Sequence, residues 1–142
     1  MSSLPCKVVS QLSEHHIEQL HDLYQKEWWS KGRTLEATRS GVSGSQIVIG
    51  LLDETDSLVG FARVVTDYTF KALIFDVIVA EQARGHGLGS RLVSLVTGHE
   101  ALRSVRHFEL YCLPELGSFY KAHGFSEEVG TIQLMRRTRE SA

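Results

Sequence analysis

Residues 82–90 read QARGHGLGS, and the three glycines Gly85, Gly87 and Gly89 occupy every second position. The apolar run LIFDVIVA (73–80) precedes this stretch, and the helix-like SRLVSLVT (90–97) follows its glycines. A glycine costs roughly 0.5–1 kcal/mol relative to alanine inside an ordered element, so three in alternation need a reason. A strand, a glycine-rich turn and a helix N-terminus together form an anion site, because backbone N–H groups point outward and the helix dipole favours negative charge.

Two familiar phosphate motifs do not fit this turn. A P-loop needs Lys after its last glycine, but Ser90 and Arg91 follow Gly89. The dinucleotide fingerprint needs a third glycine where this chain has Ser90 or Leu92, and an acid about 20 residues later, where 103–107 read RSVRH. The spacing therefore excludes both nucleotide classes.

Composition favours an ordinary single domain over 1–142 and a small-molecule partner. The chain has 142 residues and a formal charge of −2, which predicts neither a nucleic-acid nor a membrane partner. Its seven histidines, with His15, His16 and His21 in one helical stretch, lack partners at ligand spacing, so no metal is expected. Cys6 and Cys112 form no disulfide framework, and no run could span a bilayer, so the predicted compartment is the cytoplasm.

Hydrophobic periodicity predicts an α/β (α+β) fold with the order β-α-α-β-β-β-α-β-α-β. Its central sheet is expected to be mixed but mainly antiparallel, with helices on its faces. Ser13 and Thr34 are the expected N-caps of the first two helices, and Trp28 is expected on the apolar face of the first. The predicted strands are 5–9, 46–52, 58–67, 71–80, 107–112 and about 131–137; the predicted helices are 14–29, 35–40, 87–102 and 115–122.

Two motifs carry a family resemblance. Gln82, Gly85 and Gly87 form Q-x-x-G-x-G, extended by Leu88-Gly89, and FYKAHGF (119–125) matches FYxxxGF. With the element order above, the chain resembles the GCN5-related N-acetyltransferase (GNAT) family over nearly its whole length. The resemblance implies an enzyme that takes acetyl-CoA as co-substrate and transfers the acetyl group to the primary amine of a small or amino-acid-like acceptor.

The resemblance also implies a set of site residues. Backbone groups of Val77-Ile78-Val79 would hold the pantetheine arm, and one of these N–H groups would stabilise the oxyanion. Tyr120 would protonate the leaving thiolate. The turn would bind the pyrophosphate, with the Arg84 side chain adding charge; its residues are Gln82, Arg84, Gly85, His86, Gly87, Leu88, Gly89 and Ser90.

The residues leave the general base open. Asp76 is an acid within an apolar strand, and a buried carboxylate is costly unless paired, so it is expected to be a base, an ammonium anchor or a structural acceptor. Asp67, Glu27 and a base acting through water are weaker candidates. The glutamate of the histone-modifying branch would fall near Lys71, which argues against a histone-type mechanism.

The stretch EWWSKGR (27–33) supplies the expected acceptor contacts, Trp29, Lys31 and Arg33, which suit a carboxylate beside the amine. Adjacent tryptophans cannot share one helix face, so at least one of them should project away. Leu113-Pro114 stands where many relatives place an Asn that contacts the cofactor. A non-catalytic acyl-CoA-binding module is the alternative function, and a homodimer stays open.

Overall fold

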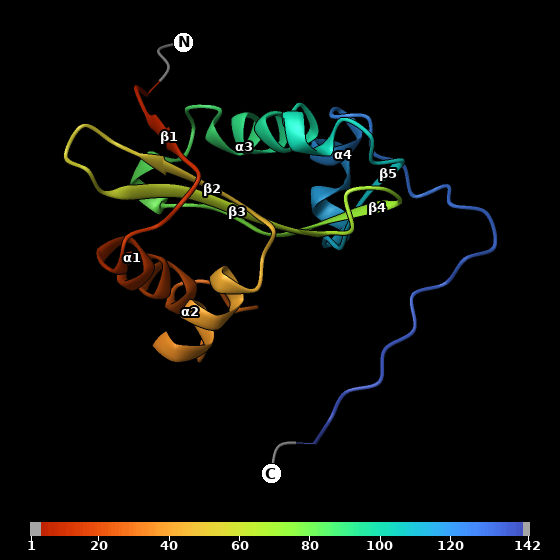
Figure 1. Ribbon diagram of the computed structural model, residues 1–142, viewed down its shortest axis with the longest axis horizontal. Coiled ribbons are helices and arrows are strands. Elements are labelled where there is room, and N and C mark those ends of the chain that lie inside the picture. The colour runs from red at the N-terminus through yellow and green to blue at the C-terminus, as the bar shows by residue number, and fades with distance from the viewer. Residues whose placement is uncertain (1–3, 141–142) are drawn as a thin grey trace. The chain divides into compact units, whose positions relative to one another are not determined.

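The computed structural model describes residues 4–140 (Figure 1). Its contacts divide the chain into two compact units, one ending at Cys112 and one beginning at Leu113. The first unit holds the sheet and three of the helices, and the second holds a short helix and the C-terminal segment.

The first unit is built on a five-stranded sheet in the order β1-β2-β3-β4-β5. Neighbouring strands are antiparallel except β4 and β5, which run parallel, so the predicted mixed, mainly antiparallel sheet is confirmed. All six residues of β2 are buried, as expected for a strand covered on both faces. The strands are β1 (Lys7–Val9), β2 (Ile47–Leu52), β3 (Leu58–Thr66), β4 (Lys71–Val79) and β5 (His107–Leu110).

Helices cover both faces of this sheet: α3 (Leu88–Thr97) lies on one face, and α1 (Glu14–Gln25) and α2 (Leu35–Ser43) lie on the other (Figure 1). Both predicted caps are confirmed, since Ser13 Oγ accepts from the His16 N–H and Thr34 Oγ1 accepts from the Ala37 N–H. Short 3₁₀ turns, η1 (Glu81–Ala83) and η2 (Glu100–Leu102), flank α3. The fully buried side chains between these layers include Leu20, Tyr24, Phe61, Val64, Leu92 and Val96.

The first helix ends at Gln25, four residues earlier than its apolar pattern predicts. The Gln25 side chain accepts from the Gly32 N–H and donates to the Arg33 carbonyl, which folds the chain back. Trp28 is consequently 71% exposed, whereas Trp29 packs edge-on against Tyr24. Trp28 therefore does not extend the apolar helix face, and it is the tryptophan that projects away.

The second unit comprises η3 (Pro114–Leu116), α4 (Gly117–Lys121) and an exposed segment. The strand predicted at about 131–137 is wrong: residues 132–140 have no regular structure, and Ile132, Leu134 and Met135 are 63–86% exposed. An alternating sequence becomes a strand only against a neighbouring ladder, and the sheet of the first unit ends at β5. None of the helices within residues 4–140 is long and apolar enough to cross a membrane.

Candidate active site

The glycine turn between η1 and α3 contains two glycines with a left-handed backbone. Gly85 and Gly87 have φ of +83° and +75°, a region that side-chain-bearing residues rarely adopt. A Cβ at either position would meet nothing within 4 Å, so the turn faces open space. Gly87 is the N-cap of α3 and, because it has no side chain, it cannot cap the helix as Ser13 and Thr34 cap theirs. The N–H groups of the first helical turn have no carbonyl within the helix, so the turn fits a phosphate group.

The remaining residues of the turn divide between solvent and core. Gln82 and Arg84 are exposed, and His86, Gly89 and Ser90 are half-buried. Leu88 is only 3% exposed and anchors the helix in the core. The predicted pyrophosphate loop therefore presents backbone to solvent while its helix is held by packing.

One edge of β4 is open beyond its midpoint. The parallel ladder with β5 runs from Lys71 opposite His107 to Ile74 opposite Leu110, where β5 ends. The strand itself continues to Val79, and among residues 4–140 no strand pairs with this edge from Phe75 onward. Backbone N–H and C=O groups on such an edge pair with any extended chain that offers amides. The predicted contact segment, Val77-Ile78-Val79, lies on this open edge and fits the amide-bearing pantetheine arm.

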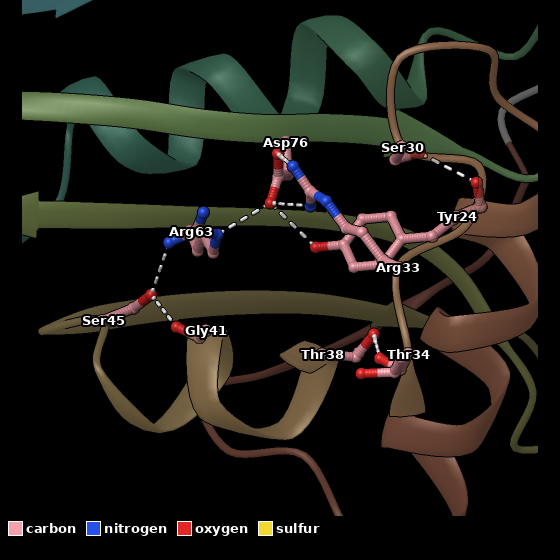
Figure 2. Close-up of polar contacts among 9 residues, drawn as sticks. All are labelled: Tyr24, Ser30, Arg33, Thr34, Thr38, Gly41, Ser45, Arg63 and Asp76. Carbon is pink, nitrogen blue, oxygen red and sulfur yellow. Dashed lines mark hydrogen bonds and ion pairs between the residues drawn. The ribbon is translucent and has the colours of Figure 1, made fainter. Parts of the chain in front are cut away.

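A β-bulge lies between the paired and the open halves of β4. The register passes from Arg63 opposite Phe75 to Phe61 opposite Ile78, so that one residue of β3 faces both Asp76 and Val77. Asp76 has φ +58°, which costs an L-residue roughly 1–2 kcal/mol. A bulge bends the strand and re-aims its side chains, and at this one the Asp76 side chain points toward α1 and α2 (Figure 2).

The Asp76 carboxylate is the centre of a polar cluster from three separate parts of the chain (Figure 2). Its Oδ2 accepts from Arg63 Nε at 2.7 Å, from Arg33 Nη1 at 2.9 Å and from the Tyr24 hydroxyl at 2.9 Å. The Asp76 side chain is 6% exposed. Burial raises the pKa of this carboxyl, but the hydrogen bonds and charges of Arg33 and Arg63 outweigh burial and hold it below its usual range. The carboxylate is therefore ionised and fully engaged.

Aromatic rings hold the two arginines in place, and one of these rings belongs to Tyr24. Burial and the Asp76 charge raise the pKa of the Tyr24 hydroxyl, so it remains a proton donor to the carboxylate. The Arg33 guanidinium lies 4.6 Å from the Tyr24 ring centroid and 5.5 Å from that of Trp29. Arg63 stacks similarly on Phe75 at 4.9 Å. Such stacking holds the planar guanidinium groups in place.

Of the three predicted acceptor contacts, Arg33 donates to Asp76, and Trp29 lies beside the Arg33 guanidinium. The Lys31 side chain is exposed and lies outside this cluster. Tyr24 and Arg63 were not among the predicted site residues. Arg63 did carry a signal, since it is a charge within the apolar strand LVGFARVVT, just as Asp76 is in LIFDVIV.

Arg84 joins the glycine turn to the loop after α1. Its Nη2 donates to Glu27 Oε1 at 2.7 Å, and its Nε donates to the Val79 carbonyl at 3.2 Å. The guanidinium expected near the pyrophosphate therefore lies between the open strand end and that loop. Asp67 is occupied differently: it accepts from the N–H groups of Thr69, Phe70 and Lys71, which lowers its pKa and closes the β3–β4 turn.

Tyr120 belongs to the second unit, on α4. Its ring meets Phe119 and Phe125 edge-on, with centroids 4.9 Å and 5.9 Å away. The Tyr120 carbonyl accepts from the N–H groups of His123 and Phe125. The motif FYKAHGF thus forms one short helix with a compact turn after it.

Comparison with known proteins assigns the family. The acetyltransferase (GNAT) domain family matches residues 44–127, more than half of the chain. The uncharacterized N-acetyltransferase ycf52 of Pyropia yezoensis is 31% identical over 128 residues, which cover 84% of this chain and 70% of that protein. The chloroplastic serotonin N-acetyltransferase 2 of rice is 30% identical over 107 residues, which cover 72% of this chain and 53% of that protein.

A crystal structure of an acetyltransferase assigned to the GNAT family from Xanthomonas campestris superimposes with a TM-score of 0.83. It is 26% identical, and the match covers 97% of this chain and 96% of that one. The matched region of the family includes the glycine turn, the open edge of β4 and the FYKAHGF motif. The chain therefore belongs to the GCN5-related N-acetyltransferase family and is an acyltransferase.

Proposed function

We propose that this protein transfers an acetyl group from acetyl-CoA to the primary amine of a small molecule or amino-acid-like acceptor. The observation that carries the proposal is the pairing of two features on one strand–turn–helix unit. These are the β4 edge that is open beyond Ile74 and the left-handed glycines at 85 and 87. Acetyl-CoA, when bound, supplies an activated thioester. The free thiols Cys6 and Cys112 suit a reducing compartment such as the cytoplasm.

The backbone of this chain would carry most of the donor binding. The N–H groups of residues 84–90 would donate to the pyrophosphate, where the glycines keep the approach clear. The edge of Val77–Val79 would pair with the amides of the pantetheine arm. One N–H group of that edge would donate to the thioester oxygen as it gains charge. Loss of one such donor typically lowers a rate about 10²–10³-fold.

The reaction itself is attack of the amine nitrogen on the thioester carbon, with cleavage of the carbon–sulfur bond. An alkylamine with a pKa of about 10.4 needs roughly 4.6 kcal/mol to become neutral at pH 7, so an ammonium proton must be removed first. We assign Tyr120 as the acid that donates its hydroxyl proton to the departing sulfur. A phenol is protonated at pH 7, and its pKa is only about 1.5 units above that of a thiol.

The contacts of Asp76 favour a structural role over the role of general base. A carboxylate that accepts from Arg33, Arg63 and Tyr24 and has a lowered pKa is a weak proton acceptor. Asp67 is likewise committed to its turn. Glu27 in turn accepts from Arg84. We therefore propose that the ammonium proton leaves to solvent water, and that Asp76 positions the two arginines.

The experiment is release of free CoA thiol from acetyl-CoA across a panel of primary amines. Turnover with at least one amine is expected, and Tyr120→Phe should lower kcat about 10-fold or more with little change in acetyl-CoA affinity. Phe119→Leu is the matched control, because it alters the same helix without removing a hydroxyl. The alternative, a non-catalytic acyl-CoA-binding module, predicts tight CoA binding without turnover on any amine and no effect of Tyr120→Phe.

The relatives leave the acceptor undecided. The rice protein is named for serotonin, a specific amine, whereas the ycf52 proteins are named for the reaction alone. The acceptor of this chain must therefore be inferred from its own side chains.

A further inference from the structure

A pocket of about 250 Å³ lies beside Asp76, between the sheet and the two helices α1 and α2. Its wall combines small residues of α2 with the polar cluster of Figure 2. The residues that matter for its chemistry are Tyr24, Arg33, Thr38, Gly41, Arg63 and Asp76. This volume is large enough for a small polar group.

The charge of this pocket is positive where it is accessible. It contains two guanidinium groups and one carboxylate, so one positive charge is uncompensated. The Asp76 side chain is 6% exposed, whereas those of Arg33 and Arg63 are 34% and 19% exposed. A molecule entering from solvent therefore meets the cations and not the anion that holds them.

The two arginines also have hydrogen-bonding capacity to spare. Within residues 4–140, Arg33 donates to both oxygens of Asp76, and Arg63 donates to Asp76 and, at 3.4 Å, to Ser45 Oγ. Each guanidinium carries more N–H donors than these contacts use. Both groups are stacked on aromatic rings, so little freedom is lost when they bind a ligand.

The pocket is next to the open edge of β4. Asp76 directly precedes Val77, the first residue of the segment proposed to hold the thioester end of the donor. A ligand whose anionic group sits in the pocket therefore has the proposed thioester site at the neighbouring residue of the same strand.

We propose that Arg33 and Arg63 bind the carboxylate of the acetyl acceptor, so that the acceptors are amino acids or small amines that carry a carboxylate. The inference rests on the proposed function and names its substrate class. A carboxylate monoanion matches the single uncompensated positive charge, whereas a phosphate dianion would exceed it. Asp76 is then a positioning residue: it holds both guanidinium groups toward the pocket without touching the acceptor.

The test compares each L-amino acid, and β-alanine, with its C-terminal amide as acceptor, and includes phosphoethanolamine. For the best pair, kcat/KM for the acid is expected to be at least tenfold higher than kcat/KM for the amide. Arg33→Gln should reduce that ratio at least tenfold, through KM more than kcat. Arg39→Gln is the matched control, because it removes an exposed arginine that pairs with Glu14 on the outer surface.

A second variant blocks the pocket and removes no charge. A Cβ at Gly41, within α2, meets only Arg63 Cζ at 3.9 Å, so Gly41→Leu should fold and fill the space. It should abolish the preference for acids. Equal use of acids and amides by the wild type, a preference for phosphoethanolamine, or an unchanged ratio in both variants would overturn the inference.

Binding is measured in parallel, by thermal-shift titration of the CoA-saturated protein with the same acid and amide pairs. Acids are expected to stabilise the wild type more than amides, and Gly41→Leu should remove the difference. If acids bind selectively but no amine is acetylated, the proposed function fails and the carboxylate pocket stands. If amines are acetylated without regard to a carboxylate, the function stands and the pocket inference fails.

Discussion

At the scale of single residues, Asp76 is the group around which the polar cluster is built. A carboxylate in a buried strand is tolerated because Arg33, Arg63 and Tyr24 each donate to it. Its left-handed backbone places the side chain among these donors. The sequence alone showed that Asp76 needs a specific role, but not its partners. Those partners lie 13 to 52 residues away, and no local pattern links such positions.

Asp76→Asn should therefore destabilise the protein without disturbing its backbone. Asparagine tolerates positive φ as aspartate does, so the change keeps the backbone but removes the charge and replaces one acceptor oxygen by an NH2 donor. Removing one partner of a buried ion pair costs about 3–5 kcal/mol, and partial exposure of Arg33 reduces the expected loss to about 2–3 kcal/mol. Urea unfolding measures it. Asp22→Asn, at an exposed position, is the control and should change stability by less than about 0.5 kcal/mol. A loss below about 1 kcal/mol for Asp76→Asn would contradict the cluster's role.

The difference in stability between the wild type and Asp76→Asn is expected to depend on pH. The pKa of Asp76 is lowered in the folded state, so its stabilising effect is complete above the unfolded pKa of about 3.9 and is lost as pH falls through the folded value. The difference in unfolding free energy between wild type and Asp76→Asn should be constant from about pH 5 to 8 and shrink below about pH 4. A difference that grows on acidification would have the wrong sign.

At the scale of elements, the strand–turn–helix unit from β4 to α3 is the proposed donor site. The sequence predicted the order of this unit, because strand, glycine turn and helix start each have a local signal, as do the caps Ser13 and Thr34. The helix itself ends at Thr97, five residues before the predicted end at 102. It did not predict the bulge at Asp76, since a bulge depends on how two strands are registered. Nor did the alternation in 131–137 produce a strand, because pairing depends on a neighbour that the segment itself does not encode.

Substitutions at Gly87 should separate stability from CoA binding. Because φ is +75° there, both Gly87→Ala and Gly87→Trp should cost roughly 1–2 kcal/mol of stability. A Cβ meets nothing within 4 Å, so the indole can extend into solvent, where it occupies the space proposed for the pyrophosphate. Calorimetry should therefore show a small loss of CoA affinity for Ala and a loss of at least 100-fold for Trp.

Gly32→Trp provides the control for this pair. Gly32 also has a positive φ, +97°, and open space around its missing Cβ, but it lies in the loop after α1. It should lose similar stability and keep its CoA affinity. Equal affinity for CoA in the wild type and Gly87→Trp would place the pyrophosphate elsewhere.

At the scale of the whole molecule, donor and acceptor are assigned to neighbouring parts of β4. The open edge and the glycine turn are assigned to acetyl-CoA, and the pocket beside Asp76 is assigned to the acceptor's carboxylate. Arg84 connects the two parts, since it contacts both Val79 at the strand end and Glu27 in the loop that precedes Arg33.

The central claim is that backbone groups of the open β4 edge and of the glycine turn hold acetyl-CoA. Hydrogen–deuterium exchange of the backbone amides, with and without CoA, tests it most directly. Residues 77–79 and 84–90 should exchange at least tenfold more slowly when CoA is bound, and this protection should be absent in Gly87→Trp. Protection confined to other segments, or unchanged exchange of residues 77–79 and 84–90 at saturating CoA, would contradict the account.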